Sequence, residues 1–273
     1  MPYAQLDSLR LYYEEYAPTG SPEPPSGETE ATVLLLHGFT LDRRVWTPQA
    51  DYFGNRRRTI LLDVRGHGLS DAPKAGYSRD DQVEDLARFV DILGIERFHL
   101  VGLSIGGATA IGYALKYQSR LVSLTLVSGW AVGWNIGRKI SHVGQVARRD
   151  GIEAARQKWQ EVTLGWYRQD QKEVRELIQL MMSEHSGAPW LDPALDWQSP
   201  ESDLPHVPDV TIPTLLMAGG SDPVFLKLAR RLNETMPNSR LSVYEGGGHI
   251  LNLEKPERFN RELGNFLVEV EKR

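Results

Sequence analysis

Cysteine is absent from this chain of 273 residues. Disulfides, thiolate metal sites and a cysteine nucleophile are therefore excluded, and the absence is compatible with a reducing compartment. No stretch approaches the roughly 20 apolar residues that a membrane-spanning helix requires. Residues 1–16 carry charges too densely for the apolar core of a signal peptide, so we expect a soluble, cytoplasmic protein.

An excess of positive charge is also lacking. The formal net charge is -5 and the sequence pI is about 5.8, so we expect neither nucleic acid nor an anionic membrane as a partner. The basic run at residues 56–58 is short and predicts a solvated turn. The length favours one domain, or one domain with an insertion, over two independent domains.

Short apolar runs alternate with amphipathic segments along the chain. The runs are apolar on both faces, which is typical of strands buried between helix layers in a parallel sheet. They occupy residues 9–13, 32–36, 58–62, 98–101, 121–127, 214–217 and 240–244. Helical patterns occupy residues 82–93, 105–117 and 256–270. The alternation predicts an α/β fold with a mostly parallel sheet flanked by helices.

One long region interrupts this alternation. Between the strands predicted at 121–127 and 214–217, three amphipathic helical patterns replace the strand pattern. The patterns are Ile136/Ile140/Val143/Val146, Ile152/Ala155/Trp159/Val162/Trp166 and Val174/Leu177/Ile178/Met181. We predict a helical cap at residues 130–210, inserted into an α/β core made of residues 1–129 and 211–273. Residues 18–30, which contain four prolines, predict a mobile polar loop.

Ser104 stands in a G-x-S-x-G pattern between a predicted buried strand and a predicted helix. The strained strand-to-helix turn of a nucleophile elbow has no room for side chains two residues before and after the nucleophile, and glycine stands at both positions, 102 and 106. A dinucleotide-binding loop would need a glycine where Ser104 stands. We therefore predict that Ser104 is a nucleophile, which requires a base to take its proton.

A histidine base and an acid are expected after the serine, in the order Ser…Asp…His. Asp222 follows the strand at 214–217, and His249 follows the strand at 240–244. Asp222 would hold the imidazole tautomer and offset the imidazolium charge, although an Asp-Pro pair can also cap a helix. Among the other histidines, we expect His99 in the core and His142, His185 and His206 on the cap surface.

A tetrahedral oxyanion needs two fixed N–H donors. We predict the Ile105 N–H, directly after the nucleophile, and the Phe39 N–H, in the loop after the strand at 32–36. His37 is expected to orient this loop rather than to take part in catalysis.

These motifs together resemble the α/β-hydrolase superfamily over nearly the whole chain apart from the cap. In order they are HGF at 37–39 with Trp46 beyond it, DVRGHGLS at 63–70, the serine elbow, GGSDP at 219–223 and GGGHILNLEKPERFN at 246–260. In this family the 63–70 stretch is structural, so His67 is left out of the predicted site. The resemblance implies no metal and no organic cofactor.

Within the family, several branches are disfavoured by single residues. Haloalkane dehalogenases and epoxide hydrolases have an aspartate where this chain has Ser104. Bacterial C–C bond hydrolases typically have a tryptophan where Ile250 follows the histidine, and the menaquinone-pathway synthase usually has an arginine at the position of Ala108. The chain instead resembles 3-oxoadipate enol-lactonase-like hydrolases and the related aryl-esterases and cofactor-free haloperoxidases.

The resemblance implies hydrolysis of a small-molecule ester or lactone through an acyl-enzyme. Two alternatives stay open: C–C bond hydrolysis of a diketone by the same triad, and a non-catalytic ligand-binding protein. The substrate pocket is sought among the tryptophans, six of which fall between 130 and 197. Trp130 and Trp134 follow a strand end, where ligands bind in open α/β sheets.

We expect Trp159 and Trp166 to pack between cap and core instead. Arg138 and Lys139 could bind a carboxylate, but a solvated helix face is the simpler explanation.

Overall fold

Eight strands form one sheet in the computed structural model, which describes residues 2–18, 30–136, 142–193 and 202–273. Their order across the sheet is β1-β2-β4-β3-β5-β6-β7-β8. The strands are β1 (Tyr3–Leu6), β2 (Leu9–Tyr16), β3 (Thr32–Leu36), β4 (Thr59–Leu62), β5 (Phe98–Leu103), β6 (Leu121–Val127), β7 (Thr214–Gly219) and β8 (Ser239–Tyr244). In this order, neighbouring strands pair in parallel from β4 through β3, β5, β6 and β7 to β8. At the other edge, β1 pairs antiparallel with β2, and β2 pairs antiparallel with β4.

The predicted strands are all present, and the α/β fold class is confirmed. All residues of β3, β4, β5 and β7 are buried, as expected for parallel strands covered on both faces. The sequence did not predict β1, because this edge strand has only two buried residues, Ala4 and Leu6.

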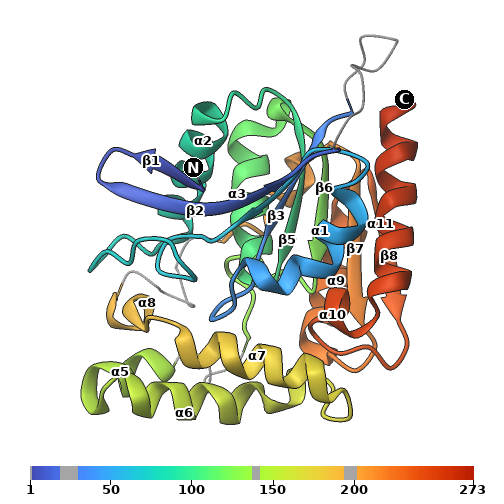
Figure 1. Ribbon diagram of the computed structural model, residues 1–273. Coiled ribbons are helices and arrows are strands. Elements are labelled where there is room, and N and C mark those ends of the chain that lie inside the picture. Colours follow the sequence, from blue (N-terminus) through green and yellow to red (C-terminus); the bar gives the residue numbers. More distant parts are fainter. Residues whose placement is uncertain (1, 19–29, 137–141, 194–201) are drawn as a thin grey trace.

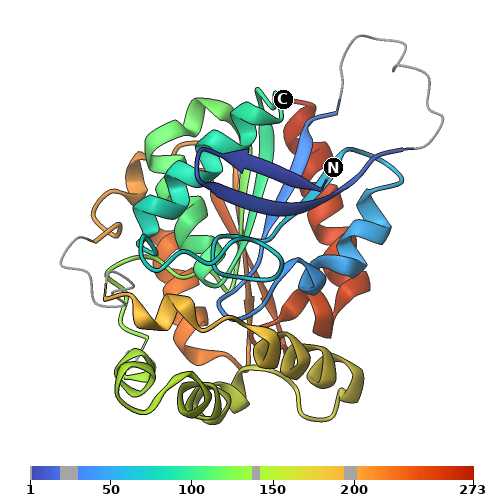
Figure 2. The same ribbon diagram turned by 60° about the vertical axis from the view of Figure 1, so that its left-hand side comes forward.

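Helices cover both faces of the sheet (Figure 2). α2 (Arg79–Ile92) packs against α3 (Ile105–Tyr117), and α1 (Thr47–Phe53) packs against α11 (Pro256–Glu271) on the other side. The remaining helices of the core are α9 (Pro223–Thr235) and the short α10 (Leu251–Glu254). α2 begins with a capping box between Ser78 and Asp81, which satisfies N–H groups that the first helical turn leaves unpaired.

A separate group of helices lies beyond one end of the sheet (Figure 1). It consists of α5 (Val143–Asp150), α6 (Ile152–Thr163), α7 (Lys172–Glu184) and α8 (Ala188–Leu191), all between β6 and β7 in the chain. We call these four helices the cap. α6 and α7 correspond to the second and third helical patterns, although Trp166 lies in a 3-10 turn after α6. α5 contains Val143 and Val146 of the first pattern, whereas Ile136 precedes it outside any helix. Ile140 and residues 19–29 of the proline-containing segment lie outside the described residues.

No helix within the described ranges combines the length and the apolar composition needed to cross a bilayer.

Candidate active site

Ser104 lies in a sharp turn between the carboxyl end of β5 and the start of α3. Its backbone has φ 54° and ψ -115°, in the left-handed region that L-residues rarely adopt. A Cβ atom on Gly102 would lie 2.3 Å from the carbonyl oxygen of Gly106, and one on Gly106 would lie 2.6 Å from the carbonyl oxygen of His37. The turn therefore requires glycine at both positions, which is the reason for the G-x-S-x-G spacing.

Backbone hydrogen bonds hold this strained turn in place. The Ser104 N–H donates to the carbonyl of Val127, at the end of β6, at 3.0 Å. The Ser104 carbonyl accepts from the N–H of Gly107 at 2.9 Å and from that of Trp130 at 2.8 Å. A non-glycine residue in such a conformation costs about 1–3 kcal/mol and persists only where its surroundings fix it.

Asp222 and His249 meet at the carboxyl ends of β7 and β8. The Nδ1 of His249 lies 2.6 Å from an Oδ2 of Asp222, and the two side chains are 1% and 4% exposed. Asp222 precedes α9 but makes no side-chain capping bond to it. Asp222 therefore bonds the imidazole of His249 and does not cap α9.

The Nε2 of His249 is buried and has no hydrogen-bond partner among the described residues. Because Nδ1 bonds a carboxylate, the neutral ring carries its proton on Nδ1, and Nε2 is left as an acceptor. The ring is packed between Phe225 and Trp166, with centroids 4.3 and 4.7 Å away. The ring of His249 and the side chain of Ser104 line the same pocket.

Glu254 supports the loop that carries His249, a role that the sequence analysis did not assign. Its Oε2 accepts a hydrogen bond from the Gly248 N–H at 2.6 Å, and burial raises the pKa of this carboxyl. Glu254 stands five positions after His249 in the sequence, but this spacing does not indicate that its carboxylate bonds the Gly248 N–H.

The loop after β3 runs past the nucleophile. A Cβ on Gly38 would lie 3.4 Å from the Cβ of Ser104, so Phe39 directly follows a residue that lies against the nucleophile. The His37 ring bonds the Gly38 carbonyl through Nδ1 at 2.8 Å and accepts from the Val64 N–H at 3.1 Å. His37 therefore orients this loop, as predicted from the sequence.

Ile105, the second predicted oxyanion donor, is the first residue of α3. Its N–H belongs to the first helical turn, which has no carbonyl of its own helix to bond and lies at the positive end of the helix dipole. The two predicted donors thus come from two separate chain segments, the start of α3 and the loop after β3.

Thr40 connects this loop to the cap. Its hydroxyl donates to the Phe39 carbonyl at 2.6 Å and accepts from the indole N–H of Trp159, in α6, at 2.7 Å. Thr40 is buried and has φ 60°, an uncommon conformation for a β-branched residue. A cap side chain therefore helps to hold the loop that carries Phe39.

A small pocket between the sheet and the cap contains both Ser104 and His249, with a cavity volume of about 20 Å³. It is lined by Gly38, Phe39, Leu41, Ser104, Trp159, Thr163, Trp166, Tyr167, Ile178, Met182, His249 and Ile250. The cap thus closes over the nucleophile with mostly apolar side chains.

The tryptophans at this pocket are not the predicted ones. Trp159 and Trp166, for which we expected packing alone, line it, whereas Trp130 and Trp134 are not among its lining residues. Trp130 instead lies beneath the nucleophile turn, with its indole N–H donating to the Trp134 carbonyl at 2.9 Å. Arg138 and Lys139 lie outside the described residues.

Among the remaining histidines, His185 corrects the sequence prediction. It is 3% exposed rather than on the surface, because the end of α7 turns inward and packs the ring against Trp190 and Phe39. Burial lowers the pKa of His185 well below its usual value and that of His67 to about 3. His99 is a buried core residue, as predicted, bonded to Ser123 and Glu271.

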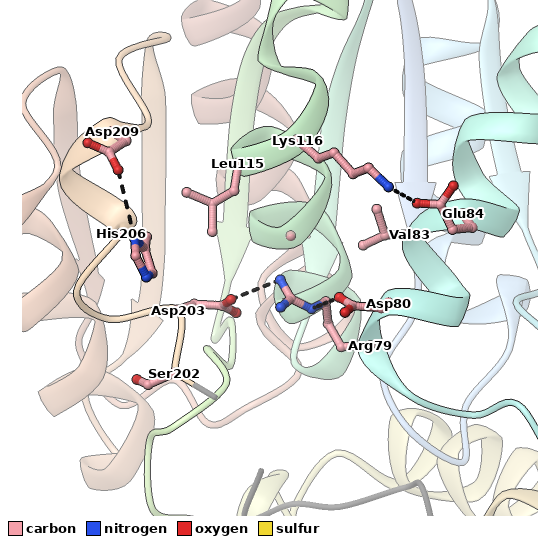
Figure 3. Close-up of a pocket in the computed structure, with 11 residues that line it drawn as sticks. Arg79, Asp80, Val83, Glu84, Leu115, Lys116, Ser202, Asp203, His206 and Asp209 are labelled. Atoms are coloured by element: carbon pink, nitrogen blue, oxygen red, sulfur yellow. Dashed lines mark hydrogen bonds and ion pairs between the residues drawn. The ribbon is translucent and has the colours of Figure 1, made fainter. Parts of the chain in front are cut away.

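A second, wider pocket lies on the surface between α2, α3 and residues 202–209, away from these groups (Figure 3). Arg79 crosses it to form ion pairs with Asp203 at 2.8 Å and Asp80 at 2.7 Å. Lys116 is paired with Glu84. The charged side chains of this pocket pair with one another, and none of its lining residues belongs to the pocket of Ser104.

Among the described residues, no three or more histidine, aspartate or glutamate side chains are placed so that they could bind one metal ion.

Known proteins are similar to this chain over most of its length. A Bacillus subtilis protein named "Putative 2-succinyl-6-hydroxy-2,4-cyclohexadiene-1-carboxylate synthase" is 28% identical, covering 87% of this chain and 90% of its own. The 3-oxoadipate enol-lactonase 1 of Acinetobacter baylyi is 24% identical, covering 89% and 91%. The solved structure of a thermophilic esterase from Thermogutta terrifontis is 26% identical, with a TM-score of 0.83 over 96% of this chain and 94% of that one.

The family assignment follows from a match over most of the chain. The model of a family described as having the alpha/beta hydrolase fold matches residues 31–256, from β3 to the start of α11. This range includes the elbow of Ser104 as well as Asp222 and His249. Together with the sheet topology, the match shows that the chain belongs to the α/β-hydrolase family and is a hydrolase with esterase- and lactonase-type relatives.

Proposed function

We propose that this protein hydrolyses a carboxylic ester or lactone through a triad of Ser104, His249 and Asp222. The observation that carries the proposal is the buried 2.6 Å bond between Asp222 and His249, which leaves the His249 Nε2 available in the pocket of Ser104. An imidazole held in this tautomer can act as a general base toward a serine hydroxyl.

The proposed reaction is acyl transfer to water. His249 takes the Ser104 proton as the hydroxyl oxygen attacks the carbonyl carbon, and the N–H groups of Phe39 and Ile105 stabilise the oxyanion. The intermediate collapses, the bond to the alkoxide breaks, and His249 returns the proton to that oxygen. A water molecule, deprotonated by His249, then attacks the acyl carbonyl carbon. The bond to the Ser104 oxygen breaks, His249 returns the proton to that oxygen, and the acid leaves.

The proposal is tested by steady-state hydrolysis of 4-nitrophenyl esters, lactones and diketones by the wild type and Ser104→Ala. We expect ester or lactone turnover that falls about 10⁴-fold or more in the variant, because a serine nucleophile and its base act as a unit. Ser202→Ala, which alters a serine outside the pocket, is the matched control. Turnover of diketones alone would assign C–C bond hydrolysis instead, and absence of turnover for all three classes would favour a non-catalytic protein.

A further inference from the structure

Resting on the proposed function, we infer that the pocket selects esters with an uncharged, apolar acyl group and rejects esters whose acyl chain carries a carboxylate. The pocket walls consist of large apolar and aromatic side chains from the cap and the core. Within the described parts of the chain, no arginine or lysine lines this pocket. An anionic acyl chain would therefore enter without a partner for its charge.

Several polar side chains of the wall already form hydrogen bonds with other groups of the protein. The Thr163 hydroxyl donates to the Trp159 carbonyl at 2.8 Å, and the Trp159 indole N–H donates to Thr40 at 2.7 Å. The Tyr167 hydroxyl is hydrogen bonded to Gln179. Thr163 and Trp159 could bond a carboxylate only by giving up one of these hydrogen bonds.

Nearby charges also act against an anion. Asp222 and Glu254 place two buried carboxyl groups behind His249. Three arginines of the surrounding elements are paired with carboxylates: Arg44 with Asp42 and Glu184, Arg156 with Glu153, and Arg168 with Asp170. Arg175 of α7 bonds the Gln169 carbonyl and does not line the pocket. Taking a carboxylate out of water into such surroundings is costly, because no cation among the described residues lines the pocket to offset the lost hydration.

Three esters separate charge from length: 4-nitrophenyl hexanoate, methyl 4-nitrophenyl adipate and 4-nitrophenyl hydrogen adipate. The last two have the same chain and differ in whether the distal carboxyl is neutral or ionised. At pH 7.5 we expect kcat/KM for the two neutral esters to exceed that for the anionic ester by about 10²–10³-fold. Equal kcat/KM for the methyl adipate and the anionic ester would overturn the inference.

A single substitution should reverse part of this preference. Leu41 lines both the active pocket and a neighbouring cleft that contains Arg44 and Glu184, so a lysine there can reach both. In Leu41→Lys we expect the neutral-to-anionic ratio to fall at least tenfold relative to Leu41→Met, the neutral control of similar length. An unchanged ratio in a folded variant would contradict the role given to charge.

Titration of the active site with a fluorophosphonate keeps this inference separate from the proposed function. Labelling of Ser104 together with good turnover of the anionic ester would overturn the selectivity and leave the serine hydrolase intact. Absence both of labelling and of turnover of the three esters would overturn the proposed function itself.

Discussion

Asp222 is buried beside His249, with one carboxylate oxygen 2.6 Å from the ring Nδ1. An asparagine has nearly the same shape, but its NH₂ group can donate to Nδ1 and so favour the wrong tautomer. We expect Asp222→Asn to lower kcat by about 10⁴-fold while the protein stays folded, as is found for the aspartate of serine protease triads. The measurement is kcat for a 4-nitrophenyl ester, alongside thermal unfolding.

Asp209→Asn is a matched control, because Asp209 is exposed and lies outside the pocket. A kcat for Asp222→Asn within tenfold of the wild type would remove Asp222 from the triad.

The positions of Ser104, Asp222 and His249 could be predicted because each follows a strand that is recognisable from its apolar run. In a parallel sheet the carboxyl ends of the strands share one edge, so residues there are brought together wherever they stand in the chain. Glu254 and Thr40 could not be found in this way. Their roles depend on where one oxygen points, to Gly248 in one case and to Phe39 in the other, and residue type alone does not determine this.

Helix α6 of the cap and the loop after β3 are joined through Trp159 and Thr40. Thr40→Val is nearly isosteric and removes the hydroxyl that bonds both the Phe39 carbonyl and the Trp159 indole. We expect kcat to fall about 3- to 10-fold with KM little changed, because the loop would hold the oxyanion donor less well. Thr40→Ser keeps the hydroxyl and should retain near wild-type kcat.

A double-mutant cycle then tests whether the two elements act together. Trp159→Phe should lower kcat by a similar factor, and the Thr40→Val/Trp159→Phe protein should be no worse than the more impaired single variant. Fully additive losses, or a change confined to KM, would show that the hydrogen bond does not position this loop.

In the cap, the sequence predicts the helices but not which of their residues contact the pocket. Helical periodicity correctly indicated apolar faces on α6 and α7, but it does not say which part of a face meets the pocket and which meets the core. Trp159 and Trp166 were therefore taken as packing residues, and His185 was expected on the surface. Packing between cap and core decides these contacts. β1 was not predicted because its four residues, two of them buried, are too short a run to show a clear alternating pattern.

Across the whole molecule, a second cluster of ionisable groups holds the C-terminal helix to the sheet, at the opposite end of β5 from Ser104. Glu271, near the end of α11, bonds Arg57 at 2.7 Å and His99 at 3.1 Å. Burial alone would raise the pKa of Glu271, but the hydrogen bonds from His99 and Arg57 lower it to about 2. The ionised carboxylate therefore stabilises the folded state.

The pKa of Glu271 is lower in the folded state than in the unfolded chain. Its ionised carboxylate therefore contributes fully to the stability of the fold above pH 4.5, and this contribution is lost as the pH falls toward 2. We expect Glu271→Gln to lower the free energy of unfolding by about 1.5–3 kcal/mol at pH 7, and by less at pH 3. Urea unfolding at the two pH values measures this difference. Glu269→Gln, which alters an exposed ion pair on the same helix, should have little effect at either pH. An equal loss for both variants, or one independent of pH, would contradict the role of the buried cluster.

The assignment of Ser104 as the nucleophile is tested most directly by intact-mass measurement after incubation with a fluorophosphonate. The wild type should gain one phosphonyl group per chain, with the adduct on the peptide that contains Ser104, and Ser104→Ala should gain none. An unmodified wild type, or an adduct that persists in the Ser104→Ala protein, would contradict the triad.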